Sequence, residues 1–126
     1  MQTQGNTSMN TLIIGNRPTE QRRADIVRAW KSGTPADAAR LDFESLEGAW
    51  HLLNGKRWAI LRTMAGQGPL AIREIARRVG RDVRAVHSDV RALYLSGVID
   101  KTEGGQMLLP YDTIRLDFAF ETQKAA

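Results

Sequence analysis

The sequence contains no cysteine, which excludes disulfide bonds, thiolate metal sites and cysteine nucleophiles. Its only histidines, His51 and His87, fall on separate expected helices, and its carboxylates are scattered without a catalytic motif. The glycine-rich run 66–69 follows an expected helix rather than a strand, and its proline removes a donor amide, so it does not resemble a phosphate-binding loop. We therefore expect no enzyme, no cofactor and no metal site.

Long hydrophobic runs are also missing. The longest ones, such as Leu12-Ile13-Ile14, are a few residues long, whereas a membrane-spanning helix needs about 20 apolar residues. The first residues, MQTQGNTSMNT, have neither a basic region nor an apolar core of the kind that signal peptides carry. These absences predict a protein of the cytoplasm with no membrane partner.

The chain has 126 residues, a length typical of one small domain with tails, and its net charge is +4. This charge is unevenly distributed, because residues 56–91 hold nine basic and three acidic groups while residues 37–47 hold one basic and four acidic groups. A positive central segment is typical of a module that docks on a polyanion such as nucleic acid. An ordinary solvated, arginine-rich helix surface is the alternative interpretation.

The first 40 residues predict a tail, a strand and a helix. Residues 1–10 are polar and predict a flexible tail, and residues 11–14 are β-branched and predict a short strand. Thr19 is placed to cap a helix that runs to about Ser32, where Gly33 ends it. A second short strand is expected over 41–43, followed by helices from Ser45 and over 56–65. We expect the three tryptophans, Trp30, Trp50 and Trp58, to lie in the core.

The segment from 70 to 109 has the clearest pattern. An apolar stripe predicts a helix that ends at Gly80, and Asp82 is placed to cap the next helix, which ends near Ser96. The apolar positions of this second helix are Val83, Val86, Val90, Leu93 and Tyr94. Residues 98–101 and 106–109 predict a hairpin around a glycine-containing turn. Strict alternation from Ile114 to Phe120 predicts a final strand, which could pair with residues 12–14, with residues 41–43 or with a second subunit.

This order of two helices joined by a tight turn and followed by a hairpin is that of the winged helix-turn-helix. The expected fold class is therefore α+β and mostly helical, with an additional N-terminal strand-helix and a C-terminal β-strand. The expected organisation is a tail at 1–10, a strand and helix for dimerisation or partner binding at 11–39, the winged helix-turn-helix domain with its C-terminal strand at 40–121, and a tail at 122–126.

In such a unit the second helix lies in the major groove of double-stranded DNA, where arginine can pair with guanine. The outward side of the 82–96 helix is polar, and the small Ala85 permits close approach. His87 lies between the two sides, so contact with DNA and packing at the helix edge both remain open, while Asp89 is expected to pair with an arginine. The candidate DNA-binding residues are Arg73, Arg77, Arg78, Arg81, Arg84, Ala85, His87, Ser88, Arg91 and Lys101.

The run GPLAIREIARRVGRDVRAVHSDVRALYLSGVID, together with GGQMLLPYD, resembles a group of small prokaryotic winged-helix regulators related to the MarR and ArsR types. The similarity covers residues 11–120, is densest at 69–112, and includes Phe43-Glu44-Ser45 and the word KRWAIL. The sequence departs from the group at Ala71, where a capping serine is usual, and at Ser88, where a basic residue is common. The resemblance implies a DNA-binding transcriptional regulator that forms a homodimer. It also implies a repressor of the antitoxin kind, encoded beside a small cognate toxin protein.

Two functions from different classes follow. The first is a sequence-specific, dimeric regulator that represses its own gene, as in a toxin–antitoxin system. The alternative is a winged-helix module that binds protein and not DNA. An acidic or apolar recognition surface would be typical of the second function, and the arginines on the expected recognition helix oppose it.

Overall fold

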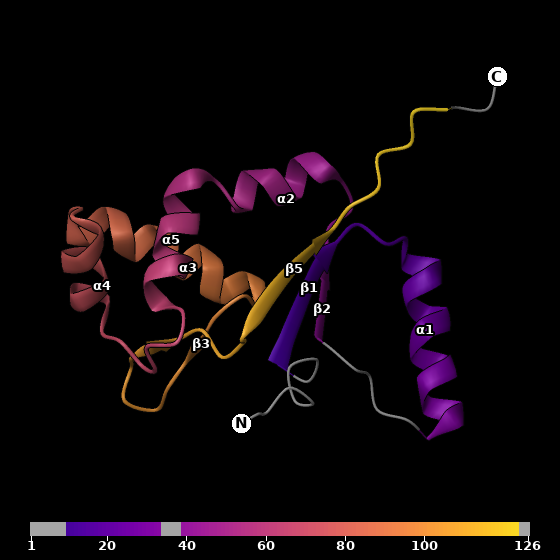
Figure 1. Cartoon of the computed structure of the whole chain (residues 1–126), viewed down its shortest axis with the longest axis horizontal. Helices are drawn as coiled ribbons and strands as arrows, with labels where there is room; N and C mark the ends of the chain where they lie inside the picture. Colours follow the sequence, from indigo (N-terminus) through magenta and orange to yellow (C-terminus); the bar gives the residue numbers. More distant parts are fainter. Residues whose placement is uncertain (1–9, 34–38, 124–126) are drawn as a thin grey trace, which may run out of the picture. The chain divides into compact units, whose positions relative to one another are not determined.

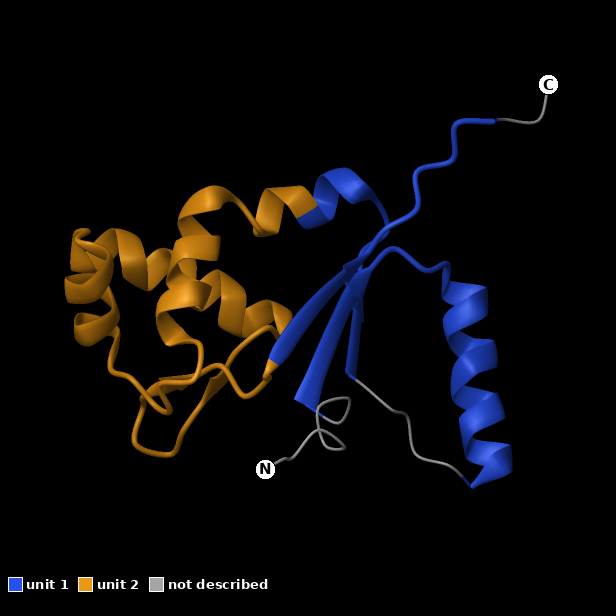
Figure 2. Ribbon diagram, in the orientation of Figure 1, with its two compact units in different colours: residues 1–49, 113–126 blue, residues 50–112 orange. Residues whose placement is uncertain are grey.

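A computed structural model describes residues 10–33 and 39–123. These residues form an α+β structure that divides into two compact units (Figures 1 and 2). Unit 1 comprises the described residues of 1–49 and 113–126, and unit 2 comprises residues 50–112. The division differs from the expected domain boundaries, because the last strand belongs to unit 1 together with the first. All but one residue of the expected tail at 1–10 and residues 124–126 lie outside the described part.

Unit 1 contains a parallel sheet in the order β2-β1-β5. The strands are β1 (Thr11–Gly15), β2 (Ala39–Asp42) and β5 (Thr113–Asp117), with Leu12 paired to Ala39 on one side and to Ile114 on the other. Leu12 and Ile14 are fully buried, as expected for the central strand of a sheet. Pairing of the last strand with residues 12–14 was one of three alternatives that the sequence left open, and it is confirmed.

Two parallel neighbours need a crossover, and helix α1 (Thr19–Ser32) provides it between β1 and β2. The predicted bounds of this helix are confirmed, but the predicted cap at Thr19 is wrong. Pro18 occupies the N-cap position, and no side chain caps the helix, because the proline ring has no acceptor for the free amides of the first turn. The hydroxyl of Thr19 accepts a hydrogen bond from Arg22 instead.

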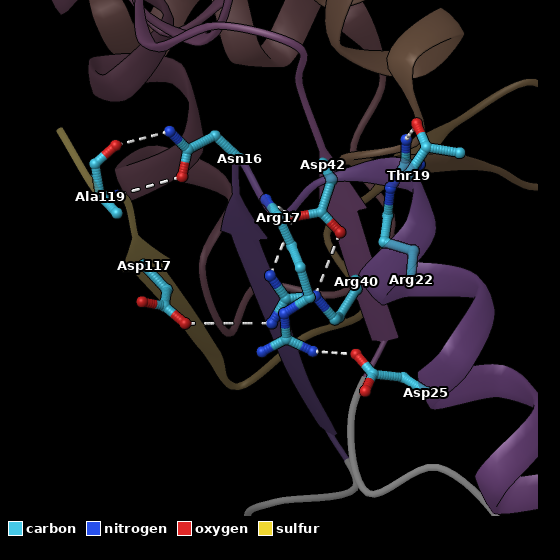
Figure 3. Close-up of polar contacts among 9 residues, drawn as sticks. All are labelled: Asn16, Arg17, Thr19, Arg22, Asp25, Arg40, Asp42, Asp117 and Ala119. Carbon is cyan, nitrogen blue, oxygen red and sulfur yellow. Dashed lines mark hydrogen bonds and ion pairs between the residues drawn. The ribbon is translucent and has the colours of Figure 1, made fainter. Parts of the chain in front are cut away.

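Polar contacts gather around the ends of the strands, and one of them reaches α1 (Figure 3). Arg17 donates to Asp25 of α1 at 2.5 Å, and Arg40 donates to Asp42 at 2.8 Å. The hydrogen bond from Arg17 lowers the pKa of Asp25 below its usual value. The amide of Asn16 exchanges two hydrogen bonds with the backbone of Ala119. Of these contacts, the ion pair between Arg17 and Asp25 joins α1 to the loop after β1.

Unit 2 is built from helices and a small hairpin. Helix α2 (Leu46–Leu52) contains the boundary between the units, and α3 (Gly55–Met64), α4 (Ile72–Val79) and α5 (Val83–Ser96) follow. Asn54 caps α3 and Asp82 caps α5 through its carboxylate, as the sequence predicted for Asp82. Gly80 and Gly97 end α4 and α5 in the left-handed conformation. The fully buried side chains of this unit are Ile60, Met64, Ile75, Val86, Val90, Leu93, Val98 and Ile99.

The hairpin consists of β3 (Asp100–Lys101) and β4 (Met107–Leu108), which are antiparallel and shorter than predicted. Leu70, before α4, exchanges two backbone hydrogen bonds of 2.8 Å with Met107 and so adds a third segment to the hairpin. The connection between α4 and α5 is only a few residues long, so the two helices must lie next to each other. Both helices bury their apolar sides in one core. The helix–turn–helix–hairpin order expected from the sequence is therefore present in unit 2.

Several predicted core residues are exposed. Trp30 and Trp50 are 82% and 59% exposed, and Val83 and Tyr94 are about 40% exposed. Val83 is the first residue of α5, where the helix has no preceding turn to pack beside it, and Tyr94 lies near the other end of the helix, under the hairpin. The prediction of burial from helical periodicity was therefore wrong at both ends of α5 and at two of the three tryptophans.

Candidate nucleic-acid interface

Helix α5 has two sides of opposite character. Val86, Val90 and Leu93 are buried completely. The other side is exposed and carries Arg84, Ala85, Ser88 and Arg91, and His87, which the sequence placed between the two sides, is exposed as well. No ion pair of the described residues involves Arg84 or Arg91. Their charges therefore face solvent and are available to an anionic ligand.

The hairpin brings a further cation to this side of α5. Lys101 of β3 places its Nζ 5.7 Å from the centroid of the Tyr94 ring, within the range of a cation–π contact. A small pocket of about 80 Å³ lies here, and its lining includes His87, Arg91, Tyr94 and Lys101. The structure thus brings together three of the predicted binding residues, one from the hairpin and two from the helix. His87 is exposed rather than packed in the core.

The basic residues of α4 are arranged differently. Arg77 and Arg78 both pair with Glu74, at 2.5 and 2.6 Å, and Arg78 also donates to the side chain of Gln67 at 3.0 Å. The hydrogen bonds from Arg77 and then Arg78 lower the pKa of Glu74 to about 2. Glu74 therefore stays ionised and offsets part of the positive charge of α4. Arg73 is exposed and belongs to no ion pair among the described residues.

Arg81 lies in the turn between α4 and α5 and faces inward. Its guanidinium is 2.9 Å from Asp89 of α5, and Asp89 also accepts from Arg57 of α3 at 2.9 Å. Burial alone would raise the pKa of Asp89, but the hydrogen bonds from Arg57 and Arg81 outweigh it and lower the pKa. The prediction that Asp89 pairs with an arginine is confirmed. The charge of Arg81, a predicted DNA-binding residue, is therefore largely neutralised by this internal ion pair.

Sequence reasoning missed two residues of this region. Arg57 was not singled out, because it lies 32 residues from Asp89 and no local spacing connects them. Tyr94 was placed in the core, although its hydroxyl end makes tyrosine suitable for a half-exposed position. Among residues 10–33 and 39–123, no cluster of three histidine, cysteine, aspartate or glutamate side chains could hold a metal ion. None of the helices in this part of the chain is long and apolar enough to cross a membrane.

Comparison with known proteins identifies a family. The chain belongs to the HVO_A0114 family, whose sequence model matches residues 52–116, from the end of α2 to β5. No curated protein and no solved structure matches the chain. The name of the family states no activity, so the function has to come from the residues of the site.

Proposed function

We propose that unit 2 is a winged helix-turn-helix that binds double-stranded DNA, and that the chain is a dimeric transcriptional regulator that represses its own gene. The exposed side of α5 carries the proposal. Arg84 and Ser88 lie near the N-terminus of α5, and the N-terminal residues of a recognition helix are the ones that contact base edges. The small Ala85 beside them leaves room for the helix to come close to DNA. Arginine is the side chain that pairs best with guanine in the major groove.

The other elements have matching roles in this proposal. Helix α4, the tight turn at Gly80 and α5 form the helix-turn-helix, and β3 and β4 form the wing. Lys101 on the wing and Arg91 at the pocket edge would contact phosphates, as would Arg73 on α4. Phosphate contacts supply affinity and position, whereas contacts from α5 select the sequence. Arg81 would orient α5 through Asp89 rather than touch DNA.

The alternative function is a winged-helix module that binds protein and not DNA. Such a module would need an apolar or acidic surface on α5. In the exposed part of α5 the large apolar side chains are Val83, Tyr94 and Leu95, at the two ends of the helix, and the middle of its exposed side is basic or small. This distribution favours a polyanion. The cognate toxin that the family resemblance implied, and the cytoplasmic location, stay predictions.

The proposal is tested with a labelled duplex that carries the DNA upstream of the chain's own coding sequence. Fluorescence anisotropy is measured at several salt concentrations, with and without unlabelled random duplex. The proposal expects tight binding that persists in the presence of the competitor. Absence of binding even at low salt would overturn it and would favour the protein-binding alternative. Weak binding to every duplex, with a steep salt dependence, would remove the claim of self-repression.

A further inference from the structure

Helix α1 carries an apolar side that the described residues of unit 1 leave uncovered. Ile26, Val27 and Trp30 are 68%, 47% and 82% exposed, and none of the residues of α1 is buried. A helix that connects two parallel strands normally packs its apolar side on a sheet, because helices in proteins gain most of their stability from such packing. The Arg17–Asp25 ion pair joins α1 to the loop after β1. Within residues 10–33 and 39–123, the helix therefore lacks its usual apolar partner.

The strand next to α1 is also incompletely paired. Among the residues that the structure describes, β2 pairs with β1 alone, so its other edge is open. The amide of Phe43 donates to Gly15, and in a parallel ladder alternate residues bond to the same neighbour. The backbone groups of Arg40 and Asp42 are consequently directed away from β1. Open edges of this kind are templates for a further strand.

A groove of about 510 Å³ runs between α1 and this edge. Its apolar lining comes from Ile26 and Ala29 of α1 and from Ala39 and Leu41 of β2. The Nε of Arg22, another lining residue, is buried and has no hydrogen-bond partner among the described residues. Figure 3 shows Arg22 beside Thr19, whose hydroxyl accepts a hydrogen bond from Nη2 of Arg22. The groove thus combines apolar surface with a charged side chain.

We propose that a second copy of this chain occupies the groove, with β2 pairing antiparallel to the partner's β2 and α1 packing against the partner's unit 1. Two-fold symmetry requires an antiparallel arrangement of two identical edges. The register is set by charge. If Leu41 faces the partner's Leu41, the Arg40–Asp42 ion pair of each chain lies antiparallel to that of the partner, so that Arg40 faces the partner's Asp42 and opposite charges meet across the strands.

The neighbouring register is less favourable. A pairing centred on Arg40 would place two arginines directly opposite each other, and like charges in that position destabilise a sheet. A pairing centred between residues 40 and 41 would place Arg40, whose backbone groups point toward the partner, opposite the partner's Leu41, whose backbone groups point toward its own β1. The two residues could then not exchange backbone hydrogen bonds. With Leu41 on the axis, Arg40 and the partner's Asp42 exchange both backbone hydrogen bonds. The apolar side chains of the two strands also stay on one face.

This inference deepens the dimeric part of the proposed function, because one α5 helix covers a few base pairs and a two-fold dimer presents two such helices to two half-sites. It does not depend on DNA, since every group that it uses lies in unit 1. Its tests are made on the full-length chain without DNA. A chain that forms this dimer but binds no duplex would contradict the DNA binding of the proposed function and not this inference. A DNA-binding monomer would contradict this inference and the dimeric part of the proposed function, and would leave DNA binding by unit 2 intact.

The absence of cysteine allows a direct test of the register. The variant Leu41→Cys places a single thiol on the two-fold axis, where paired Cα atoms lie about 4.5 Å apart, within the range that a disulfide spans. Ala39→Cys is the matched control, because residue 39 lies two positions from the axis on each strand and the two thiols would be about 13 Å apart. We expect mild oxidation to produce a covalent dimer of the first variant and not of the second. Equal cross-linking of both variants, or of neither, would overturn the proposed pairing.

The contribution of α1 is tested by mass measurement, which also covers the case in which Leu41→Cys fails to fold. Trp30→Ser removes the most exposed large side chain of α1, and Trp50→Ser removes an exposed tryptophan of α2. Sedimentation at tens of micromolar should give a wild-type mass of two chains. Trp30→Ser should weaken the dimer by about tenfold or more, whereas Trp50→Ser should not. A monomeric wild-type chain, or a dimer that Trp30→Ser leaves intact, would contradict the inference.

Discussion

The carboxylate of Asp89 lies 2.9 Å from the guanidinium of Arg81, and this contact joins the turn before α5 to the middle of the helix. The same carboxylate accepts a hydrogen bond from Arg57 of α3 at 2.9 Å. Asp89 is therefore the point at which α3, the turn and α5 are fixed to one another. The side chains of all three residues are less than a quarter exposed.

Asp89→Asn should destabilise unit 2. It removes the negative charge between two largely buried guanidinium groups. Loss of one partner from an ion pair with this little exposure costs about 2–4 kcal/mol of unfolding free energy. Asp100→Asn is the control, because it removes an exposed carboxylate of the same type. Urea unfolding followed by circular dichroism measures both. An equal effect of the two substitutions would show that the Asp89 contacts do not stabilise the fold.

The same contacts predict a dependence on pH. The pKa of Asp89 is lower in the folded chain than the usual value near 3.9, so its contribution to stability is fully present above that value. This contribution is lost as the pH falls through the folded-state pKa. The difference in unfolding free energy between the wild-type chain and Asp89→Asn should therefore shrink as the pH is lowered from 5 toward 2. A difference that stays constant over this range would contradict the assignment.

Lys101→Ala should weaken binding to every duplex alike. Lys101 lies on the hairpin, over the Tyr94 ring of α5, and the proposed function assigns it a contact with phosphate rather than with a base edge. Loss of one phosphate contact reduces the slope of log affinity against log salt by about one. Lys101→Arg is the control, because it keeps the charge and should keep the slope. A slope that Lys101→Ala leaves unchanged would show that the hairpin does not contact the backbone.

Ala71→Ser should stabilise unit 2 by about 1 kcal/mol. Ala71 occupies the N-cap position of α4 in extended conformation and provides no side-chain acceptor. A serine there can accept a hydrogen bond from a free amide of the first turn. The same substitution at Ala65, the C-cap residue of α3, is the control and offers no such cap. Urea unfolding that shows no gain for Ala71→Ser over Ala65→Ser would refute the capping argument.

Gly15→Ala should weaken the pairing of β1 with β5. A Cβ at residue 15 would collide with the backbone carbonyl of Asp117, which cannot move without breaking the ladder. Overpacking of this kind costs about 1–3 kcal/mol. Gly55→Ala is the control, because a Cβ there meets open space. Hydrogen exchange of the β5 amides measures the effect, and protection that Gly15→Ala leaves unaltered would contradict the close approach.

Much of unit 2 could be predicted from the sequence because its signals are local. The cap at Asp82, the glycines after α4 and α5 and the 3.6-residue apolar period each act within one helix. The order of elements in unit 1 was also predicted, but its parallel sheet was not, since β1 and β5 are about 100 residues apart and strand pairing leaves no local mark. The exposed tryptophan of α1 was mistaken for a core residue for the same reason: periodicity shows that a helix has an apolar side, not what covers it.

The candidate site shows a similar limit. Helical geometry placed Arg84, Ser88 and Arg91 correctly on the exposed side of α5. It could not show that Arg81 turns inward or that Arg77 and Arg78 share Glu74, because these outcomes depend on side-chain partners chosen in the folded chain. Lys101 and Tyr94 meet through the tertiary packing of the hairpin.

The central claim is that α5 selects a DNA sequence, and one comparison tests it most directly. The affinities of the wild-type chain and of Arg84→Ala are measured for the upstream duplex and for a random duplex at one salt concentration, with Arg115→Ala, an exposed arginine of β5, as the control. The account predicts that Arg84→Ala loses about 1–3 kcal/mol on the upstream duplex and little on the random one, while the control changes neither. An equal loss on both duplexes, or no loss on either, would contradict it.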